Sequence, residues 1–381
     1  MIQRVVIVSF VVLMALSFTG NSYAKEPKPL AAGEVSPAAD CGSCHKEIYE
    51  MWRESMHAKS LSDPIFQTSY LEAYTASEGK AKKICLNCHA PVVMINGDYD
   101  LKQDVTKEGL TCHFCHSIVD ANPEAPASSN DRFTLDVGKG IRTPNQDGKN
   151  DYHTHISSPI HGKSELCAGC HEFSANGIKI MSTYTEWLNG PYAAKGVQCQ
   201  TCHMPKQKLG AGRTSSKKEV FSHYLAGGHS IMQVKKAVKV SIDGITRGKD
   251  RVIVDLIVEN SGSGHYVPTG IPTRKLILTC SITTGGKPVK AKKIIYEKIL
   301  FDEKGRELTT DTELLLGYGT QVVKDNRLAP GEARKEKLVF YVEPGGEILV
   351  SARVDYVYSP RIIQQEKMEV EMNSAEKVFS E

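Results

Sequence analysis

Ten of the eleven cysteines in the sequence stand in five copies of one pattern, Cys-x-x-Cys-His. The paired cysteines are Cys41 and Cys44, Cys85 and Cys88, Cys112 and Cys115, Cys167 and Cys170, and Cys199 and Cys202. The histidines that close the copies are His45, His89, His116, His171 and His203. In this pattern two thiols bond to the two vinyl groups of one porphyrin, and the histidine ligates the iron from one face. The sequence therefore predicts five covalently attached haems of the c type, each with its iron.

Two other chemistries also use paired cysteines. Cys-x-x-Cys can form a disulfide in an oxidising compartment, or it can supply half of a zinc site. Neither chemistry requires a histidine directly after the second cysteine, whereas all five copies here have one. Haem attachment is therefore favoured. The remaining cysteine, Cys280, lies in an apolar run and is predicted to be a small buried hydrophobic side chain.

The second axial ligand of each iron would come from the other histidines. The sequence has 13 histidines, and the five in the motifs leave eight, which is enough for two histidines on every iron. Iron with two histidine ligands suits electron transfer, whereas an open iron face suits catalysis. The supply of histidine therefore favours an electron carrier. The candidate second ligands are His57, His153, His161, His223, His229 and His265.

Two of these candidates are argued from their neighbourhood in the sequence. His57 follows His45 by roughly 18 Å of helix, so it is expected to ligate the iron of a different motif; the alternative is a surface residue. His229 follows a pair of glycines that would let the backbone come close to a flat macrocycle, and we expect at least one of His223 and His229 to be a ligand.

The other histidines are less constrained. His161 stands six residues before a motif, and His153 and His155 need not both be ligands. His113 lies inside a motif, where its own haem limits its direction, so it is predicted to be a non-ligand. His265 lies in a turn rich in Gly and Pro beyond the last motif. It is either an exposed turn residue or a ligand that reaches back to a haem.

Residues 1–24 have the pattern of an export signal. A basic start precedes an apolar run from Val5 to Phe18, and small residues stand at Ser22 and Ala24, after which cleavage is expected. The alternative is a retained membrane anchor, but the run is shorter than the roughly 20 apolar residues of a spanning helix. We expect an exported protein in the periplasm, at the outer-membrane surface or outside the cell.

Composition and periodicity divide the rest of the chain. The sequence of 381 residues is 40% hydrophobic with a net charge of only +3, which indicates a globular protein and no nucleic-acid partner. Residues 25–233 should form a mostly α or irregular domain packed around its haems, with short helices after the motifs and surface loops at 120–150 and 207–218. Residues 234–381 should form a β-sandwich with a hairpin turn at 302–305. The predicted fold class is therefore α+β.

Several stretches resemble multihaem cytochromes of the cytochrome c-554 and hydroxylamine oxidoreductase class. They are Cys41 to His45 followed by Trp52, Ser55 and His57; Tyr184 to Trp187 leading through Pro191-Tyr192 and Gly196 to Pro205; and His223 to His229. The segment Gly264 to Gly270 resembles a β domain often fused to such cytochromes in metal- and sulfur-respiring bacteria. The resemblance implies haems packed edge to edge as a continuous electron path.

The chain also departs from that class. Hydroxylamine oxidoreductases have more haems and a catalytic haem crosslinked to tyrosine, for which no matching motif is found. Pentahaem nitrite reductases usually have lysine in one motif, whereas all five motifs here end in histidine.

These observations leave three hypotheses for function. The first is an exported carrier that passes electrons between redox proteins, such as other cytochromes or quinol-oxidising complexes, through mainly bis-histidine haems. The second is a reductase or oxidase that acts on a small nitrogen or sulfur oxyanion at one five-coordinate haem. The third is a homo-oligomeric filament subunit in which a histidine ligates a haem of the neighbouring chain.

Overall fold

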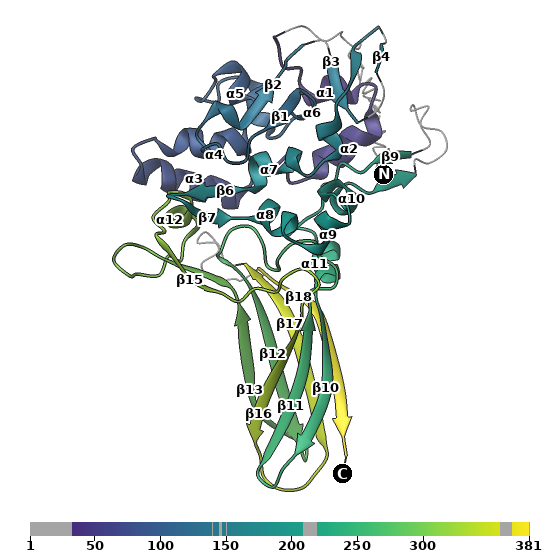
Figure 1. The fold of residues 1–381 in the computed structure, drawn as a ribbon, viewed down its shortest axis with the longest axis vertical. Coiled ribbons are helices and arrows are strands. Elements are labelled where there is room, and N and C mark those ends of the chain that lie inside the picture. The colour runs from purple at the N-terminus through teal and green to yellow at the C-terminus, as the bar shows by residue number, and fades with distance from the viewer. Residues whose placement is uncertain are drawn as a thin grey trace, which may run out of the picture.

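A computed structural model describes residues 33–138, 140–144, 147–149, 151–208, 219–358 and 368–380. The predicted export signal and most of the predicted loop at 207–218 lie outside the described residues. The fold class is α+β, as predicted: a helical and irregular N-terminal unit lies at one end of an elongated β-sandwich (Figure 1). Within these ranges, no helix has the length and apolar character needed to cross a membrane.

The N-terminal unit consists of short elements. Its helices are α1 Ala38–Gly42, α2 Lys46–Glu54, α3 Pro64–Ala76, α4 Ala81–His89, α5 Val93–Asn96, α6 Cys112–Cys115, α7 Glu165–His171, α8 Thr183–Leu188, α9 Pro191–Ala194, α10 Cys199–His203 and α11 Ile231–Ala237, with 3₁₀ turns η1 Asp104–Glu108, η2 Asn130–Arg132 and η3 Pro159–Gly162. Its strands are β1 Ile118–Ala121, β2 Phe133–Leu135, β3 Gly140–Thr143, β4 Gly148–Lys149, β5 Thr154–Ser157, β6 Phe173–Ala175, β7 Ile178–Met181, β8 Lys206–Lys208 and β9 Glu219–Phe221. They pair in sheets of two or three strands.

The apolar core of this unit is small and divided. One buried cluster is centred on Leu86 and Val93, and a second is centred on Phe114 and Phe133. These two clusters bury little apolar surface for a unit of this length. A folded domain normally has one continuous core instead. The prediction that the unit packs around bulky cofactors is consistent with this division.

Three expectations for this unit need correction. Four of the five motifs lie inside helices rather than before them, because α4, α6, α7 and α10 contain their cysteines. Helix α2 ends at Glu54, since Ser55 has an extended backbone with ψ 158°, so His57 lies beyond the helix. The predicted surface loop 120–150 contains β2, β3 and β4, and its Arg132 is buried because it donates to the carbonyl oxygens of Ala125, Gly169 and Glu172.

The β-sandwich has two antiparallel sheets. Strands β10 Lys239–Arg247, β11 Arg251–Glu259 and β16 Ala333–Tyr341 form one sheet in the order β10-β11-β16. Strands β12 Arg274–Thr284, β13 Lys287–Tyr296, β17 Ile348–Tyr358 and β18 Met368–Phe379 form the other in the order β13-β12-β17-β18. Buried residues alternate along β11, along β12 and over the first seven residues of β17, as expected of strands with one face on a core. The last five residues of β17 are all buried. Figure 1 shows the strands running along the length of the molecule.

Most sequence predictions for this half are confirmed. Cys280 is fully buried in the core between the sheets, and this burial raises the pKa of its thiol to about 11. Asp302 to Gly305 forms a tight turn in which the Gly305 amide donates to the Asp302 carbonyl oxygen at 3.1 Å. The apolar run 293–301 is divided between β13 and β14 (Lys298–Phe301) at Glu297. Strand β18 pairs with β17 at the edge of its sheet, and four of its twelve residues are charged, namely Glu369, Glu371, Glu376 and Lys377.

Segments of the sandwich reach back onto the N-terminal unit. The hairpin of β14 and β15 (Gln321–Asp325) and the short helix α12 (Asp311–Leu315) lie beside that unit, with α12 against α3 (Figure 1). The strongest polar link is a buried ion pair of 2.7 Å between Arg327 and Glu186, whose side chains are 5% and 4% exposed. Helix α11 spans the predicted domain boundary at 233/234 and leads directly into β10.

The buried ion pair predicts a large loss of stability in the variant Arg327→Ala. Removing the guanidinium leaves Glu186 buried without its charged partner, which costs about 3–5 kcal/mol. A denaturant titration of the purified protein should show this loss in the free energy of unfolding. The control is Arg251→Ala, since Arg251 pairs with Asp250 at the surface and such pairs contribute about 0–1 kcal/mol. Equal losses in the two variants would contradict the proposed role of the buried pair.

Candidate haem sites

The five motifs present their thiols as haem attachment requires. A helical turn between the two cysteines of a motif puts both side chains on one face of the helix, because residues three apart are neighbours there. All eleven cysteines are free, so none of the pairs forms a disulfide. In the described ranges, no three or more His, Cys, Asp or Glu side chains converge on a point that could hold a metal ion. The disulfide and zinc interpretations therefore have no support in the geometry.

Three motif histidines have their rings fixed by a backbone carbonyl. The Nδ1 of His89 lies 2.8 Å from the Ser60 carbonyl oxygen. The Nδ1 of His116 lies 2.6 Å from the Arg142 carbonyl oxygen, and the Nδ1 of His203 lies 2.6 Å from the Ala226 carbonyl oxygen. A carbonyl only accepts, so Nδ1 carries the proton and Nε2 is left with its lone pair. This is how proteins fix the tautomer of a histidine that ligates a metal through Nε2.

Four motif histidines face a second histidine at a common distance. The ring centres lie 6.3 Å apart for His45 and His153, 6.1 Å for His171 and His57, 6.5 Å for His116 and His223, and 6.4 Å for His203 and His265. Two imidazoles on opposite faces of one metal ion, with metal–nitrogen bonds of about 2 Å, have ring centres roughly 6 Å apart. The four pairs therefore have the spacing of bis-histidine iron sites.

The acid–base state of these rings fits ligation. Burial is the main cause that lowers the pKa of His57 and of His223 to about 4 and that of His171 to about 3. Neutral imidazole is the form that ligates a metal, so the rings are held in the required state around neutral pH.

His116 has two histidine neighbours, and the hydrogen bonds distinguish them. The His161 ring centre lies 5.6 Å away, but its Nε2 is already bonded to the Cys115 carbonyl oxygen at 3.1 Å. His223 instead bonds the Phe221 carbonyl oxygen through Nδ1 at 2.8 Å, which leaves its Nε2 available. The geometry favours His223 as the ligand opposite His116.

His89 differs from the other four motif histidines. All 13 histidines lie among the described residues, and none of them forms a ring pair with His89. Its ring neighbour is Phe66, which stacks on the imidazole with ring centres 3.8 Å apart and planes inclined by 12°. Phe66 thus lies beside the imidazole and limits its rotation, but it offers no ligand atom.

Two of the facing histidines are held by contacts that sequence analysis did not identify. The carbonyl oxygen of His57 accepts from the Leu110 amide at 3.0 Å, and a Cβ on Gly109 would lie 2.6 Å from that oxygen. Gly109 also has φ +73°, so only glycine fits there without strain. His57 is therefore fixed by the segment that leads into the third motif.

His265 is delivered by the β-sandwich. Its Nδ1 lies 2.9 Å from the Tyr266 carbonyl oxygen and 3.0 Å from Ser263 Oγ, and its Nε2 lies 3.4 Å from the same hydroxyl. Arg327 packs over the Tyr266 ring and donates to the Pro268 carbonyl oxygen at 3.2 Å. Because Arg327 also pairs with Glu186, the loop of His265 is tied to α8 of the N-terminal unit.

The remaining histidines have other surroundings. His113 is buried and its Nδ1 accepts from the Ser36 amide at 2.9 Å, in agreement with its predicted role as a non-ligand. The ring of His155 lies 4.6 Å from that of His153. His229 has no ring partner in the described part of the chain.

The effect of one thiol on the pKa of another indicates which motifs are neighbours. A side-chain hydrogen bond with Cys112 lowers the pKa of Cys41, one with Cys170 lowers that of Cys88, and one with Cys199 raises that of Cys167. The first motif therefore lies beside the third, and the fourth lies beside both the second and the fifth. After Cys199 and burial, Cys115 is a further cause that raises the pKa of Cys167, so the third motif is also near the fourth. The five motifs thus form one connected group.

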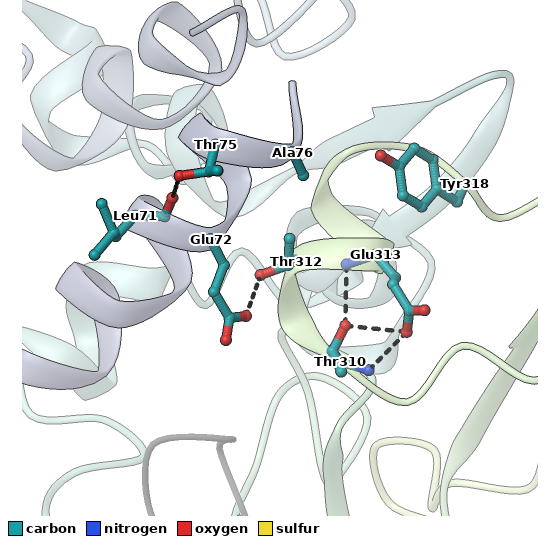
Figure 2. Close-up of a pocket in the computed structure, with 8 residues that line it drawn as sticks. All are labelled: Leu71, Glu72, Thr75, Ala76, Thr310, Thr312, Glu313 and Tyr318. Carbon is teal, nitrogen blue, oxygen red and sulfur yellow. Dashed lines mark hydrogen bonds between the residues drawn. The ribbon is translucent and has the colours of Figure 1, made fainter. Parts of the chain in front are cut away.

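A surface crevice away from the motifs is a separate feature. Figure 2 shows it between α3 and α12, where it has a volume of 490 Å³. It contains no cysteine or histidine; its lining residues are Leu71, Glu72, Thr75, Ala76, Thr310, Thr312, Glu313 and Tyr318. Its polar groups bond one another, since Thr312 lies 3.1 Å from Glu72 and Glu313 closes the capping box of α12 with Thr310. The crevice is therefore explained by the packing of the two helices.

Comparison with known proteins agrees with this geometry. The family described as "Cytochrome c554 and c-prime" matches residues 40–117, which include the first three motifs. The crystal structure of a penta-heme cytochrome c552 from Thermochromatium tepidum matches with a TM-score of 0.72 and 23% identity, over 91% of this chain and 100% of that chain. This chain has the fold of a multihaem c-type cytochrome. The motifs and the fold together identify haem c, with its iron, as the cofactor.

Other matches are weaker. A beta-glucosidase from Kluyveromyces marxianus matches with a TM-score of 0.20 and 9% identity, over 38% of this chain and 14% of that chain. Beta-glucosidase 3B from Thermotoga neapolitana matches with a TM-score of 0.16 and 17% identity, over 38% and 17% of the two chains. Scores this low carry no argument about fold or function. No curated protein matches the chain.

The hydrogen bonds around His116 generate a test. We expect His223→Ala to convert one low-spin haem to high spin, because it removes the imidazole whose Nε2 is free. The matched variant His161→Ala should leave the spin states unchanged. Electron paramagnetic resonance of the oxidised proteins measures both. The opposite pattern would show that His161 is the ligand, since its Nδ1 is buried without a hydrogen-bond partner.

Proposed function

We propose that the protein is an exported pentahaem cytochrome that carries electrons between other redox proteins. The haems would be attached at the five cysteine pairs, with the motif histidines as first ligands. His153, His57, His223 and His265 would be the second ligands at the first, fourth, third and fifth motifs. The observation that carries this assignment is the common spacing of about 6 Å in four histidine pairs.

The arrangement of the motifs supports a path for electrons. Each haem, when bound, supplies an iron that can exchange one electron with its neighbours. The chain's contribution is to hold the attachment points in one connected group, from the first motif to the third, on to the fourth, and from there to both the second and the fifth. The partners would be other cytochromes or quinol-oxidising complexes, in the periplasm or at the outer surface of the cell.

One observation favours a second function at a single site. His89 has no facing imidazole, so the iron of the second motif would have an open face. A haem held there would supply an iron able to take a small nitrogen or sulfur oxyanion, and the neighbouring fourth motif would be the source of electrons for its reduction. The same chain would then be a carrier with a reductase centre at one branch of its path.

The filament hypothesis is less well supported. It requires a histidine that reaches a haem of a neighbouring chain, and a residue such as His57 or His265 reaching outward would support it. Both lie near 6 Å from a motif histidine of their own chain.

The first experiment is to determine the spin states of the purified, oxidised protein by electron paramagnetic resonance, together with its haem content. We expect five haems per chain, of which four are low-spin and one, about one fifth of the iron, is high-spin. The reason is that His89 is the one motif histidine without a facing histidine ring in the described part of the chain. Five low-spin haems would remove the reductase centre and leave a carrier alone. Fewer than five haems would contradict the assignment of the cofactors.

A ligand variant tests the contribution of the β-sandwich. We expect His265→Ala to increase the high-spin fraction from about one fifth to about two fifths of the iron, because the fifth motif loses its second ligand. Haem content should stay unchanged, since the thioether bonds do not depend on His265. The control is His155→Ala, which removes a histidine that faces no motif histidine.

A further inference from the structure

The guanidinium of Arg274 has few hydrogen-bond acceptors around it for a charged group. It is the first residue of β12, at the end of the sandwich that meets the N-terminal unit (Figure 1). Its guanidinium lies 5.3 Å from the ring centre of Tyr358, and Nη1 makes one long bond of 3.4 Å to the Thr269 carbonyl oxygen. Its Nε is buried and has no hydrogen-bond partner.

The nearest carboxylate does not supply the missing partner. Asp311 accepts hydrogen bonds from Thr273 at 2.6 Å and from Tyr358 at 2.7 Å, and the described part of the chain shows no ion pair between Asp311 and Arg274. A guanidinium offers five N–H donors, and a buried charge is costly unless it is paired and hydrogen-bonded. The contacts therefore leave room for an anionic acceptor beside Arg274.

Two glycines bring the backbone close to this guanidinium. A Cβ on Gly270 would lie 2.8 Å from Nη1, and Gly270 has φ +85°, a conformation that favours glycine. A Cβ on Gly228 would lie 3.3 Å from the Tyr356 hydroxyl and 3.5 Å from Nη1 of Arg274. His229 follows Gly228 directly in the sequence, so its backbone adjoins the guanidinium and the Tyr356 hydroxyl.

This region lies between two motifs. Burial and then the charge of Arg274 lower the pKa of His229, and Arg274 also contributes, after burial and two neighbouring histidines, to the low pKa of His171. Asp63 has the opposite effect on His229 and on His89, where burial is again the largest cause. The region is therefore near the first ligands of both the fourth and the second motifs.

We propose that Arg274, His229 and Tyr356 form a binding site for a carboxylate or small oxyanion where the β-sandwich meets the haem-binding unit. A planar guanidinium with free donors matches two oxygens of such an anion. The anion is either the propionate of a haem in the same chain or a free oxyanion from solution. The site rests on its own contacts, so it does not depend on whether the iron at His89 is open.

The experiment uses the haem-loaded protein and two probes, phosphate and nitrite, with binding measured by calorimetry. Nitrite binding at an open iron would change the spin state, which separates that event from binding at Arg274. The variants are Arg274→Gln, Arg274→Lys and His229→Gln. The matched control is Arg251→Gln, since Arg251 is an exposed arginine of the same β-sandwich whose partner is Asp250 at the surface. Haem content and thermal unfolding show whether each variant is folded.

Two results support the site and tell the sources apart. If the site takes an anion from solution, phosphate should bind the protein. Its affinity should then fall about tenfold or more in Arg274→Gln and less in Arg274→Lys. If a haem propionate occupies the site, phosphate should not bind. The midpoint potential of one haem should then become more negative in Arg274→Gln, because a positive charge near the iron is lost. The proposal is overturned if phosphate does not bind and Arg274→Gln and Arg251→Gln both leave every midpoint potential unchanged.

Discussion

On the proposed assignment, the structure depends on one requirement: an iron held by two histidines would need two imidazoles with ring centres about 6 Å apart and both Nε2 atoms directed toward it. A motif supplies only the first imidazole, and a backbone carbonyl at Nδ1 fixes its orientation in His89, His116 and His203. The second imidazole must come from a distant part of the chain. The short helices, the small sheets and the divided apolar core of the N-terminal unit make sense as supports for these two sets of side chains.

The β-sandwich belongs to the same arrangement. It has a continuous core of its own, with Cys280 among its buried residues, yet its loops extend over the N-terminal unit and bring His265 to within 6.4 Å of His203. The ion pair between Arg327 and Glu186 ties that loop to α8. The two units can therefore be told apart by their secondary structure, whereas the proposed coordination of the fifth haem needs both.

Sequence alone identified the features that are local in the chain. The five motifs, their histidines and the alternating strands each occupy a few consecutive residues, so their chemistry can be recognised without a fold. The facing histidines cannot be paired in this way, because His57 and His171 are brought together only by contacts such as the Gly109–Leu110 segment against the His57 backbone. Buried polar anchors were missed for the same reason: Arg132 lies in a polar segment that reads as a loop, and only its three carbonyl partners show that it is internal.

The contacts between thiols of different motifs bear on how the protein is assembled. Cys41 with Cys112, Cys88 with Cys170 and Cys167 with Cys199 are pairs that each join two motifs. A chain that reached this fold before its thioether bonds formed would hold these sulfurs together in an oxidising environment, where neighbouring thiols form disulfides. Such crosslinks would block six of the ten attachment cysteines. If the haems are attached as proposed, attachment while the chain is still open, with the thiols kept reduced, would avoid these crosslinks.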